Sequence, residues 1–170
     1  MKETILLVLI IACLSCKNEK KQKELINRDV STEHQFKEIS SPGIIEPVKW
    51  TTAVEKISNT EYDLILKATI EPNYHLYSQN IPDNGPRPTV FVFEKNGNFE
   101  LIGNTTEEKG HTVFDPTFKM KIKYFDTEVI FKQKVKVKNI DSLKISGEIE
   151  FMTCNDANCV LGYDDFEFTL

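Results

Sequence analysis

Two cysteines near the end of the chain carry the clearest chemistry in the sequence. Cys154 and Cys159 lie in FMTCNDANCVLG, residues 151–162, and the four residues NDAN separate them. Two thiols at this spacing can form a structural disulfide, bind a metal ion, or exchange disulfides with other proteins. Which of these three roles the two cysteines can have depends on the cellular compartment of the protein and on the fold around them.

A metal site fits the sequence poorly. Structural zinc sites usually combine two close pairs of ligands, and no second pair accompanies the cysteines. The three histidines, His34, His75 and His111, are scattered along the chain. We therefore expect neither a metal nor an organic cofactor.

A structural disulfide and a redox pair both remain open from the residues alone. A disulfide that closes so small a loop restricts the unfolded chain by only about 2 kcal/mol, and a domain of this size has enough core to fold without it. A pair beside a loop is also within reach of a partner. These arguments weaken the structural reading without removing it.

The N-terminus indicates export. Lys2 precedes an apolar run, Ile5 to Leu14, which is shorter than the roughly 20 residues that a membrane-spanning helix needs and is typical of a secretory signal. The segment resembles a bacterial lipobox, in which cleavage precedes a cysteine that receives lipid. We expect this cysteine to be Cys16, with Cys13 as the alternative; an uncleaved anchor or a plain signal peptide is the competing reading.

Lipid would hold an otherwise polar chain on a membrane, because each buried CH2 group contributes roughly 0.8 kcal/mol. We expect a protein of the periplasm or cell envelope of a Gram-negative bacterium, where disulfides persist. Residues 17–45 have few apolar side chains and no aromatic one before Phe36, which predicts a flexible polar tether. The domains are then a signal peptide over 1–16, this tether, and a folded domain over 46–170.

The folded domain shows an alternation with a period of two. Segments in which apolar and polar residues alternate, or in which β-formers cluster, cover 62–70, 89–94, 119–125, 128–138, 143–153 and 166–170. Turn-forming residues separate them, as in the loop NIPDNGPRPT, and no segment has a helical stripe. This pattern predicts an all-β, immunoglobulin-like antiparallel sandwich. The formal net charge of −5 argues against nucleic acid as a partner.

The cysteines fall at a predicted hairpin. Strands that end at Thr153 and begin after Cys159 flank NDAN, four good turn formers, so Cys154 and Cys159 should face each other across its mouth. Facing residues of an antiparallel pair are close enough for a disulfide.

From about Val48 to Leu170 the chain resembles the N-terminal periplasmic domain of the membrane disulfide reductase DsbD. The segments that carry the resemblance, in chain order, are VKW ending at Trp50, PNYHLYSQN, FDPTFKMKIKYF and GEIEFMTCNDANC. The cysteine element is the most specific of them. The Pro-Pro that often follows the second cysteine of the family is replaced here by VLGYDD. The whole reductase of the family continues into a transmembrane part and a thioredoxin-like domain, whereas this sequence ends at Leu170. We therefore expect the electron-supplying part to be a separate polypeptide, or the domain to be a stand-alone derivative.

The resemblance implies an immunoglobulin-like domain that relays reducing equivalents by thiol–disulfide exchange, as one component of a protein-disulfide reductase. Cys159 would attack and Cys154 would resolve the mixed disulfide. The implied partners are thioredoxin-fold or other periplasmic disulfide proteins and a separate membrane electron donor. The alternative is a lipoprotein interaction module in which the disulfide is only a local clamp.

The family also implies an aromatic cap over the cysteines. Phe118 in the sequence DPTF is the first choice for the cap, Phe114 is the alternative, and Asp115 belongs to the same loop. Both phenylalanines have a second reading as ordinary core residues.

Asp156 and Tyr163 are expected to border the site. Because Asp156, Asp164 and Asp165 bring negative charge close to the thiols, we expect a sluggish free thiol whose pKa does not fall below about 7.

The aromatic residues upstream are read as structural. Trp50, Tyr74 and Tyr77 are expected in the core, and His75 is expected to be packed and hydrogen-bonded rather than catalytic.

Overall fold

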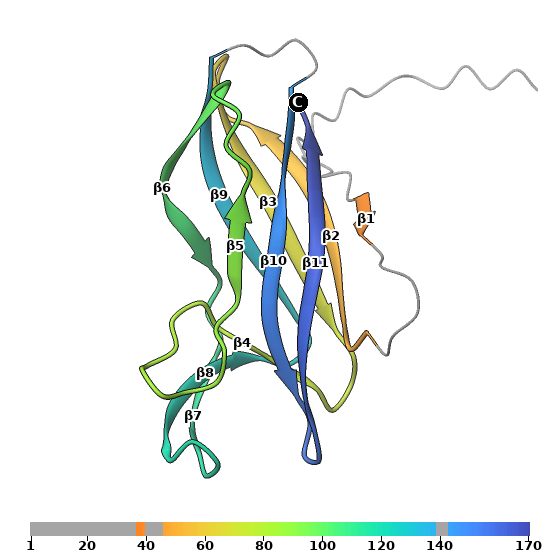
Figure 1. The fold of residues 1–170 in the computed structure, drawn as a ribbon, viewed down its shortest axis with the longest axis vertical. Coiled ribbons are helices and arrows are strands. Elements are labelled where there is room, and N and C mark those ends of the chain that lie inside the picture. The colour runs from red at the N-terminus through yellow and green to blue at the C-terminus, as the bar shows by residue number, and fades with distance from the viewer. Residues whose placement is uncertain (1–36, 40–45, 139–142) are drawn as a thin grey trace, which may run out of the picture. The chain divides into compact units, whose positions relative to one another are not determined.

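The computed structural model describes residues 37–39, 46–138 and 143–170, and within them every regular element is a β-strand (Figure 1). The predicted signal peptide, with Cys13 and Cys16, lies outside the described residues. Of the predicted tether, the structure describes only Lys37–Ile39, a short strand β1 that pairs antiparallel with the next strand.

Ten further strands follow β1. They are β2 (Val48–Lys56), β3 (Glu61–Ile70), β4 (His75–Tyr77), β5 (Val90–Phe93), β6 (Phe99–Glu107), β7 (His111–Asp115), β8 (Met120–Phe125), β9 (Glu128–Val137), β10 (Lys144–Cys154) and β11 (Cys159–Thr169). All six segments predicted to be strands lie in or overlap a strand of the structure. Strands β2, β4, β6 and β7 have no counterpart among the predicted ones.

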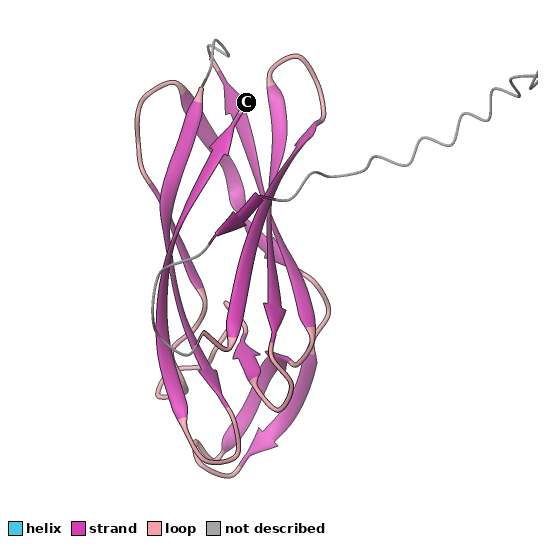
Figure 2. Cartoon of the chain, turned by 90° about the vertical axis from the view of Figure 1, so that its right-hand side faces the viewer, coloured by secondary structure: helices cyan, strands magenta, loops and turns pink. Residues whose placement is uncertain are grey.

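The strands form two antiparallel sheets packed face to face (Figures 1 and 2). One sheet has the order β1-β2-β3-β9-β6, and the other has the order β11-β10-β4-β8-β7. Strands β5 and β4 follow one another along the same edge of β10. This architecture confirms the predicted immunoglobulin-like sandwich.

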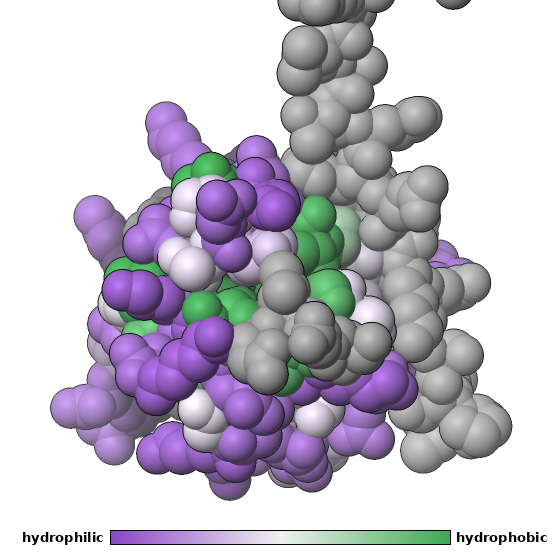
Figure 3. Space-filling model, turned by 90° about the horizontal axis from the view of Figure 1, so that it is seen from above, coloured by the Kyte–Doolittle hydropathy of each residue, from purple (hydrophilic) through white to green (hydrophobic). Residues whose placement is uncertain are grey.

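The core between the sheets is centred on Trp50, which is fully buried. Its ring lies 5.8 Å from the rings of Phe91 and Phe131 and 5.6 Å from that of Phe151, measured between centroids. Tyr77 is buried as well, and Tyr74 packs against the core from its edge. The predicted core positions of Trp50 and Tyr74 are confirmed, whereas Tyr77 is buried in a separate, smaller cluster. At the end that carries the C-terminus, hydrophilic side chains dominate the visible surface (Figure 3).

Gln133 breaks the apolar alternation of β9 but is buried. The hydrogen bonds of its side-chain amide explain why a polar residue occupies this buried position. The neighbouring strand β6 shifts register between Ile102 and Thr106, around Gly103, whose φ is +68°. The side-chain amide of Gln133 donates from Nε2 to the Ile102 carbonyl at 3.3 Å, and its Oε1 accepts from Thr105 Oγ1 at 2.9 Å. Gln133 therefore supplies hydrogen bonds where the bulge interrupts the ladder.

A buried carboxylate fixes the loop after β4. The Glu107 side chain is 5% exposed and lies 2.9 Å from Lys123 Nζ. It also accepts hydrogen bonds from Ser78 Oγ, from the Gln79 backbone N–H and from Asn80 Nδ2. Burial raises the pKa of Glu107, but these four donors outweigh it and hold the pKa below its usual value. The carboxylate thus joins β6, β8 and the 78–80 loop in its charged form.

Replacing Glu107 by Gln should destabilise the domain at neutral pH by about 1–3 kcal/mol, because the ammonium of Lys123 loses its charged partner. The folded-state pKa lies below the ordinary 4.5, so the stabilisation is present above pH 4.5 and is lost as the pH falls through the folded-state value. The difference in unfolding free energy between wild type and Glu107→Gln should therefore shrink in acid, which urea unfolding at several pH values would measure.

Glu100→Gln is the matched control, since Glu100 lies on the same strand and pairs with Lys138 on the surface, where its side chain is 61% exposed. It should change stability little. Equal effects of the two variants at neutral pH would contradict the anchoring role of Glu107.

Candidate functional site

Strands β10 and β11 form the predicted hairpin, and its mouth holds the two cysteines. Cys154 and Cys159 are directly opposite in the register and are joined by a disulfide, with their Cα atoms 4.0 Å apart. Asn155 builds the turn: its Oδ1 accepts hydrogen bonds from the backbone N–H groups of Ala157 and Asn158 at 2.9 and 2.8 Å. The NDAN turn therefore sets the register that places the sulfurs together.

The two cysteines differ in exposure. Cys154 is 2% exposed, whereas Cys159 is exposed. Along β10 the inward side chains are those of Ile149, Phe151 and Thr153, so Cys154 lies on the outward face. Its burial must therefore come from side chains outside the main core.

A small group of side chains, here called the outer cluster, covers Cys154 on this outward face. Its fully buried members are Tyr77, Ile122 and Cys154 itself, and partly buried side chains pack around them: Ile81, Phe118, Met120, Tyr124 and Met152. The cluster combines β4, β8 and β10 with the loops that follow β4 and β7. The Glu107 network lies directly before Ile81 and so supports this cover.

Phe118, the first choice for the cap, is part of the outer cluster. Its ring centroid lies 6.4 Å from that of Tyr77, with the two rings edge to face. Asp115 shapes the turn that presents it, because its Oδ1 accepts hydrogen bonds from the backbone N–H groups of Thr117 and Phe118 at 2.8 and 3.1 Å. The residue after Phe118, Lys119, has a φ of +56°, which closes the turn into β8.

Phe114, the alternative cap, is placed differently. It is 62% exposed and lies opposite Lys121 in the register of β7 and β8. Val113 and Asp115, its neighbours, face Ile122 and Met120 of the outer cluster, so Phe114 projects from the other side of β7. Of the two phenylalanines, Phe118 is the one that packs against the cluster containing Cys154.

His75 lies beside the cysteines, which the sequence did not indicate. It is directly opposite Cys154 in the pairing of β4 with β10. Its Nε2 is 3.1 Å from the Tyr77 hydroxyl, and its ring packs against the rings of Tyr77 and Tyr124 with centroids 5.0 Å apart. His75 is therefore packed and hydrogen-bonded, as expected, but its position is directly beside the cysteine pair.

The ionisable groups around Cys154 are shifted by burial. Burial lowers the pKa of His75, and the nearby carboxylates of Asp115, Asp156 and Asp126 oppose this without cancelling it. Burial, with a contribution from Asp115, raises the pKa of Tyr77 to about 12. At neutral pH the ring of His75 is therefore uncharged and the Tyr77 hydroxyl keeps its proton.

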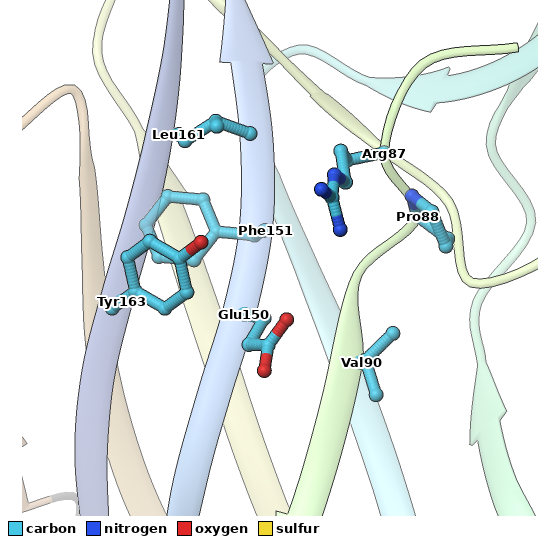
Figure 4. A pocket seen from close by; sticks show the side chains of 7 residues that line it. All are labelled: Arg87, Pro88, Val90, Glu150, Phe151, Leu161 and Tyr163. Carbon is cyan, nitrogen blue, oxygen red and sulfur yellow. The ribbon is translucent and has the colours of Figure 1, made fainter.

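The residues expected to border the site lie on two sides of it. Asp156 is exposed in the hairpin turn, and its charge reaches His75. Tyr163 is 63% exposed on β11. It lines a shallow pocket with Leu161 of the same strand, Glu150 of β10 and Arg87 before β5 (Figure 4).

This pocket lies on the same face as the cysteines. Leu161 and Tyr163 follow Cys159 at alternate positions of β11, so their side chains project from the face that carries the exposed sulfur. Gly162 between them leaves room for the Phe151 ring, whose nearest atom would be 2.1 Å from an added Cβ. The hairpin thus presents Cys159, Leu161 and Tyr163 as one continuous row.

Two further findings concern the described part of the chain. It contains no group of three or more His, Cys, Asp or Glu side chains placed to hold a metal ion. No helix in the described ranges is long and apolar enough to cross a membrane.

Comparison with known proteins gives a family match. The model of the family described as thiol:disulfide interchange protein DsbD, N-terminal, matches residues 45–170. No curated protein sequence resembles the chain closely enough to count as a match.

Solved structures give more distant likenesses. The N-terminal periplasmic domain of ScsB from Proteus mirabilis superposes with a TM-score of 0.55 at 15% identity, covering 78% of this chain and 49% of that one. The reduced N-terminal domain of DsbD from Neisseria meningitidis gives 0.45 at 12% identity, covering 71% and 83%. The GAE domain of GGA2p from Saccharomyces cerevisiae gives 0.45 at 8% identity, covering 80% and 97%.

These structural likenesses concern the fold alone. The chain spans about half of the ScsB chain that it matches.

If Phe118 caps the cysteines, Phe118→Ala should speed the reaction of the reduced pair with a small disulfide such as oxidised glutathione. The variant would lose about 1–2 kcal/mol of apolar packing, which corresponds to a roughly 5- to 30-fold faster reaction if opening of the cover limits the rate. Stopped-flow measurement of the thiols consumed gives the rate.

Phe114→Ala, on β7 close to the same turn but exposed, is the matched control and should react like the wild type. Unchanged kinetics in Phe118→Ala would remove the cap role from Phe118, and acceleration only in Phe114→Ala would transfer it to Phe114.

Proposed function

The chain belongs to the family of N-terminal domains of the thiol:disulfide interchange protein DsbD, and from this premise we propose that it exchanges disulfides with partner proteins through Cys154 and Cys159. One observation carries the proposal: the two bonded cysteines are placed unequally, with Cys159 exposed and Cys154 buried within the outer cluster. An exchange pair needs one accessible sulfur and a second thiol held nearby.

The reaction proceeds in two balanced steps. The Cys159 thiolate attacks one sulfur of the partner's disulfide, so that a mixed disulfide forms and the partner's other sulfur leaves as a thiolate. The Cys154 thiolate then attacks Cys159 Sγ, which closes the internal disulfide and releases the partner's second sulfur. Two electrons pass to the partner, and the two thiols that it gains take up two protons.

The assignment of roles follows from exposure. Cys159 is exposed to an incoming disulfide, whereas Cys154 is buried in the outer cluster, against which Phe118 packs. This supports Cys159 as the attacking residue and Cys154 as the resolving residue. Phe118, presented by Asp115, serves as the cap that partner docking moves aside.

The proposal extends to location and partners. We place the domain in the periplasm, anchored through lipid on Cys16 and reached by way of residues 17–45. Its partners are thioredoxin-fold proteins, and its electrons come from a separate membrane donor. The domain uses its own cysteines and requires neither metal nor organic cofactor.

The partner would dock along β11. Leu161 is 49% exposed and Tyr163 is 63% exposed, in a row with Cys159, and Val90 of β5 adds a further apolar side chain to the rim of the same pocket. Exposed apolar and aromatic side chains next to a reactive group are typical of docking surfaces. Contacts of the partner with Leu161 and Tyr163 would therefore position its disulfide next to Cys159.

The reduction potential of the pair tests the proposal against the clamp alternative. We expect a value between about −200 and −260 mV, because structural disulfides lie below about −300 mV and exchange-active ones lie higher. The measurement uses the full chain with Cys13→Ser and Cys16→Ser, so that only Cys154 and Cys159 titrate, in glutathione and then dithiothreitol buffers. A potential well below −300 mV with slow exchange would make the hairpin a clamp and defeat the proposal.

Docking along β11 predicts a selective defect in Leu161→Glu. Exchange with oxidised thioredoxin, used as a thioredoxin-fold probe, should slow by about tenfold, since losing an apolar contact at such a surface costs more than about 1 kcal/mol. Exchange with a small uncharged disulfide such as hydroxyethyl disulfide, which presents no apolar protein surface to Leu161, should be unchanged.

Leu101→Glu provides the control, because Leu101 is 45% exposed but lies on β6 of the other sheet. If Leu161→Glu exchanged with thioredoxin as fast as Leu101→Glu, the β11 row would not be the docking surface.

A further inference from the structure

Three side chains form a row across the outward face of the second sheet. His75 of β4 is directly opposite Cys154 of β10, and Cys154 is directly opposite Cys159 of β11. Residues directly opposite in antiparallel strands point to the same face with their Cβ atoms about 4.5–5.5 Å apart. His75 is therefore the side neighbour of the buried sulfur, on the flank away from Cys159.

The position of His75 is held from several directions. Its ring packs against the rings of Tyr77 and Tyr124, and its Nε2 is hydrogen-bonded to the Tyr77 hydroxyl. Thr153 Oγ1 donates to the His75 carbonyl at 2.9 Å, which ties β4 to β10 next to Cys154. When Nε2 carries the ring hydrogen and donates it to Tyr77, Nδ1 holds the lone pair that can accept a proton.

The charged groups that act on His75 are acidic and come from three elements. They are Asp115 at the end of β7, Asp126 after β8 and Asp156 in the hairpin turn. The other titratable side chains near His75 are Cys154 and Cys159 of the row and the phenols of Tyr77 and Tyr124. Burial prevails over the three carboxylates and lowers the pKa of His75 below 6.5, so the ring is neutral near pH 7.

The surroundings of Cys154 disfavour ionisation of its thiol. A thiolate is disfavoured both by burial and by nearby negative charge, and Cys154 is 2% exposed in an acidic neighbourhood. In the proposed exchange, however, Cys154 must become a thiolate to attack the mixed disulfide at Cys159. The exposed Cys159 can lose its proton to water, whereas Cys154 is shielded from water and is directly opposite His75 in the pairing of β10 with β4.

We propose that His75 accepts the proton of Cys154 during resolution of the mixed disulfide. This inference rests on the proposed exchange function. The Cys154 S–H bond breaks, the proton moves to the imidazole, and the resulting thiolate forms the new bond to Cys159 Sγ while the bond from Cys159 to the partner sulfur breaks. The partner sulfur leaves as a thiolate, and the imidazolium then returns its proton to that thiolate or to water.

The reverse reaction uses the same group as an acid. When a partner thiolate attacks Cys159 Sγ of the oxidised domain, Cys154 is the leaving sulfur, and the imidazolium of His75 supplies its proton. His75 therefore acts on the buried sulfur in both directions and leaves the exposed sulfur to the solvent.

The test separates the two steps with one reagent. The full chain carrying Cys13→Ser and Cys16→Ser is reduced and mixed with dithiobis(nitrobenzoate), whose coloured product thionitrobenzoate reports each step. Attack by Cys159 releases the first thionitrobenzoate, and resolution by Cys154 releases the second. The rate of each phase is measured across the pH range for the wild type, His75→Gln and His111→Gln.

His75→Gln should slow the second phase by roughly 10- to 100-fold near pH 7, the contribution of a modest general base, and leave the first phase unchanged. In the wild type the second-phase rate should rise through the pKa of His75, below 6.5, and then level off. In His75→Gln it should rise only as the thiol itself ionises, around pH 8.5 or above, so the defect narrows in alkaline solution. A purely structural effect of the substitution would not depend on pH in this way.

His111→Gln is the matched control. His111 also packs against Tyr124, with ring centroids 5.7 Å apart, but its side chain is 60% exposed on β7. Its second phase should match the wild type. Three results for His75→Gln would overturn the role of His75. They are a second phase as fast as in the wild type, a second phase slowed by the same factor at every pH, and a first phase that is slowed as well.

These outcomes are separate from the fate of the proposed function. If the wild-type pair had a reduction potential below about −300 mV, as structural disulfides do, and showed no rapid second phase, the exchange function would fail and the role of His75 with it. If the wild type resolved rapidly and His75→Gln did the same, only the inference about His75 would fail.

Discussion

The site depends on one constraint: Cys154 projects from the outward face of β10 and still has to stay out of water. The main core lies on the other face of the sheet and cannot cover it. The cover comes instead from Tyr77 and Ile122, with partly buried neighbours such as Phe118. Because this outer cluster packs on the sandwich without being part of its core, it can open at a small local cost while both sheets remain folded. Access to the sulfur is thus separated from the stability of the fold.

The rest of the structure makes that separation workable. The Trp50-centred core fixes the sheets, and the Glu107 network fixes the loop that leads from Tyr77 to Ile81. The disulfide adds little to this framework, since a bond across a four-residue turn restricts the unfolded chain only slightly. Oxidation and reduction of the pair therefore leave most of the folding free energy unchanged. A larger disulfide loop would have coupled redox state to unfolding.

The sequence predicted the parts of this arrangement that depend on local pattern. Alternation with a period of two identified the long strands, and NDAN between two of them predicted the hairpin that pairs Cys154 with Cys159. Strand β4 has only three residues, too few to show a period, and most of β6 is exposed. The position of His75 escaped prediction for a different reason: its pairing with Cys154 joins segments far apart in the chain, and no local pattern encodes such a register.

From the sequence alone, the charges near the hairpin all disfavour a thiolate, because every charged residue that follows the cysteines is acidic. The structure adds two further carboxylates, Asp115 and Asp126, but it also adds the ring of His75, and the two sulfurs meet these groups differently. Cys159 is exposed, so water screens the negative charge around it. Cys154 is shielded from water, and an adjacent ring that can share its proton matters most there. The same burial that makes Cys154 slow to ionise keeps that ring neutral and ready to accept a proton, so one physical cause sets the state of both partners.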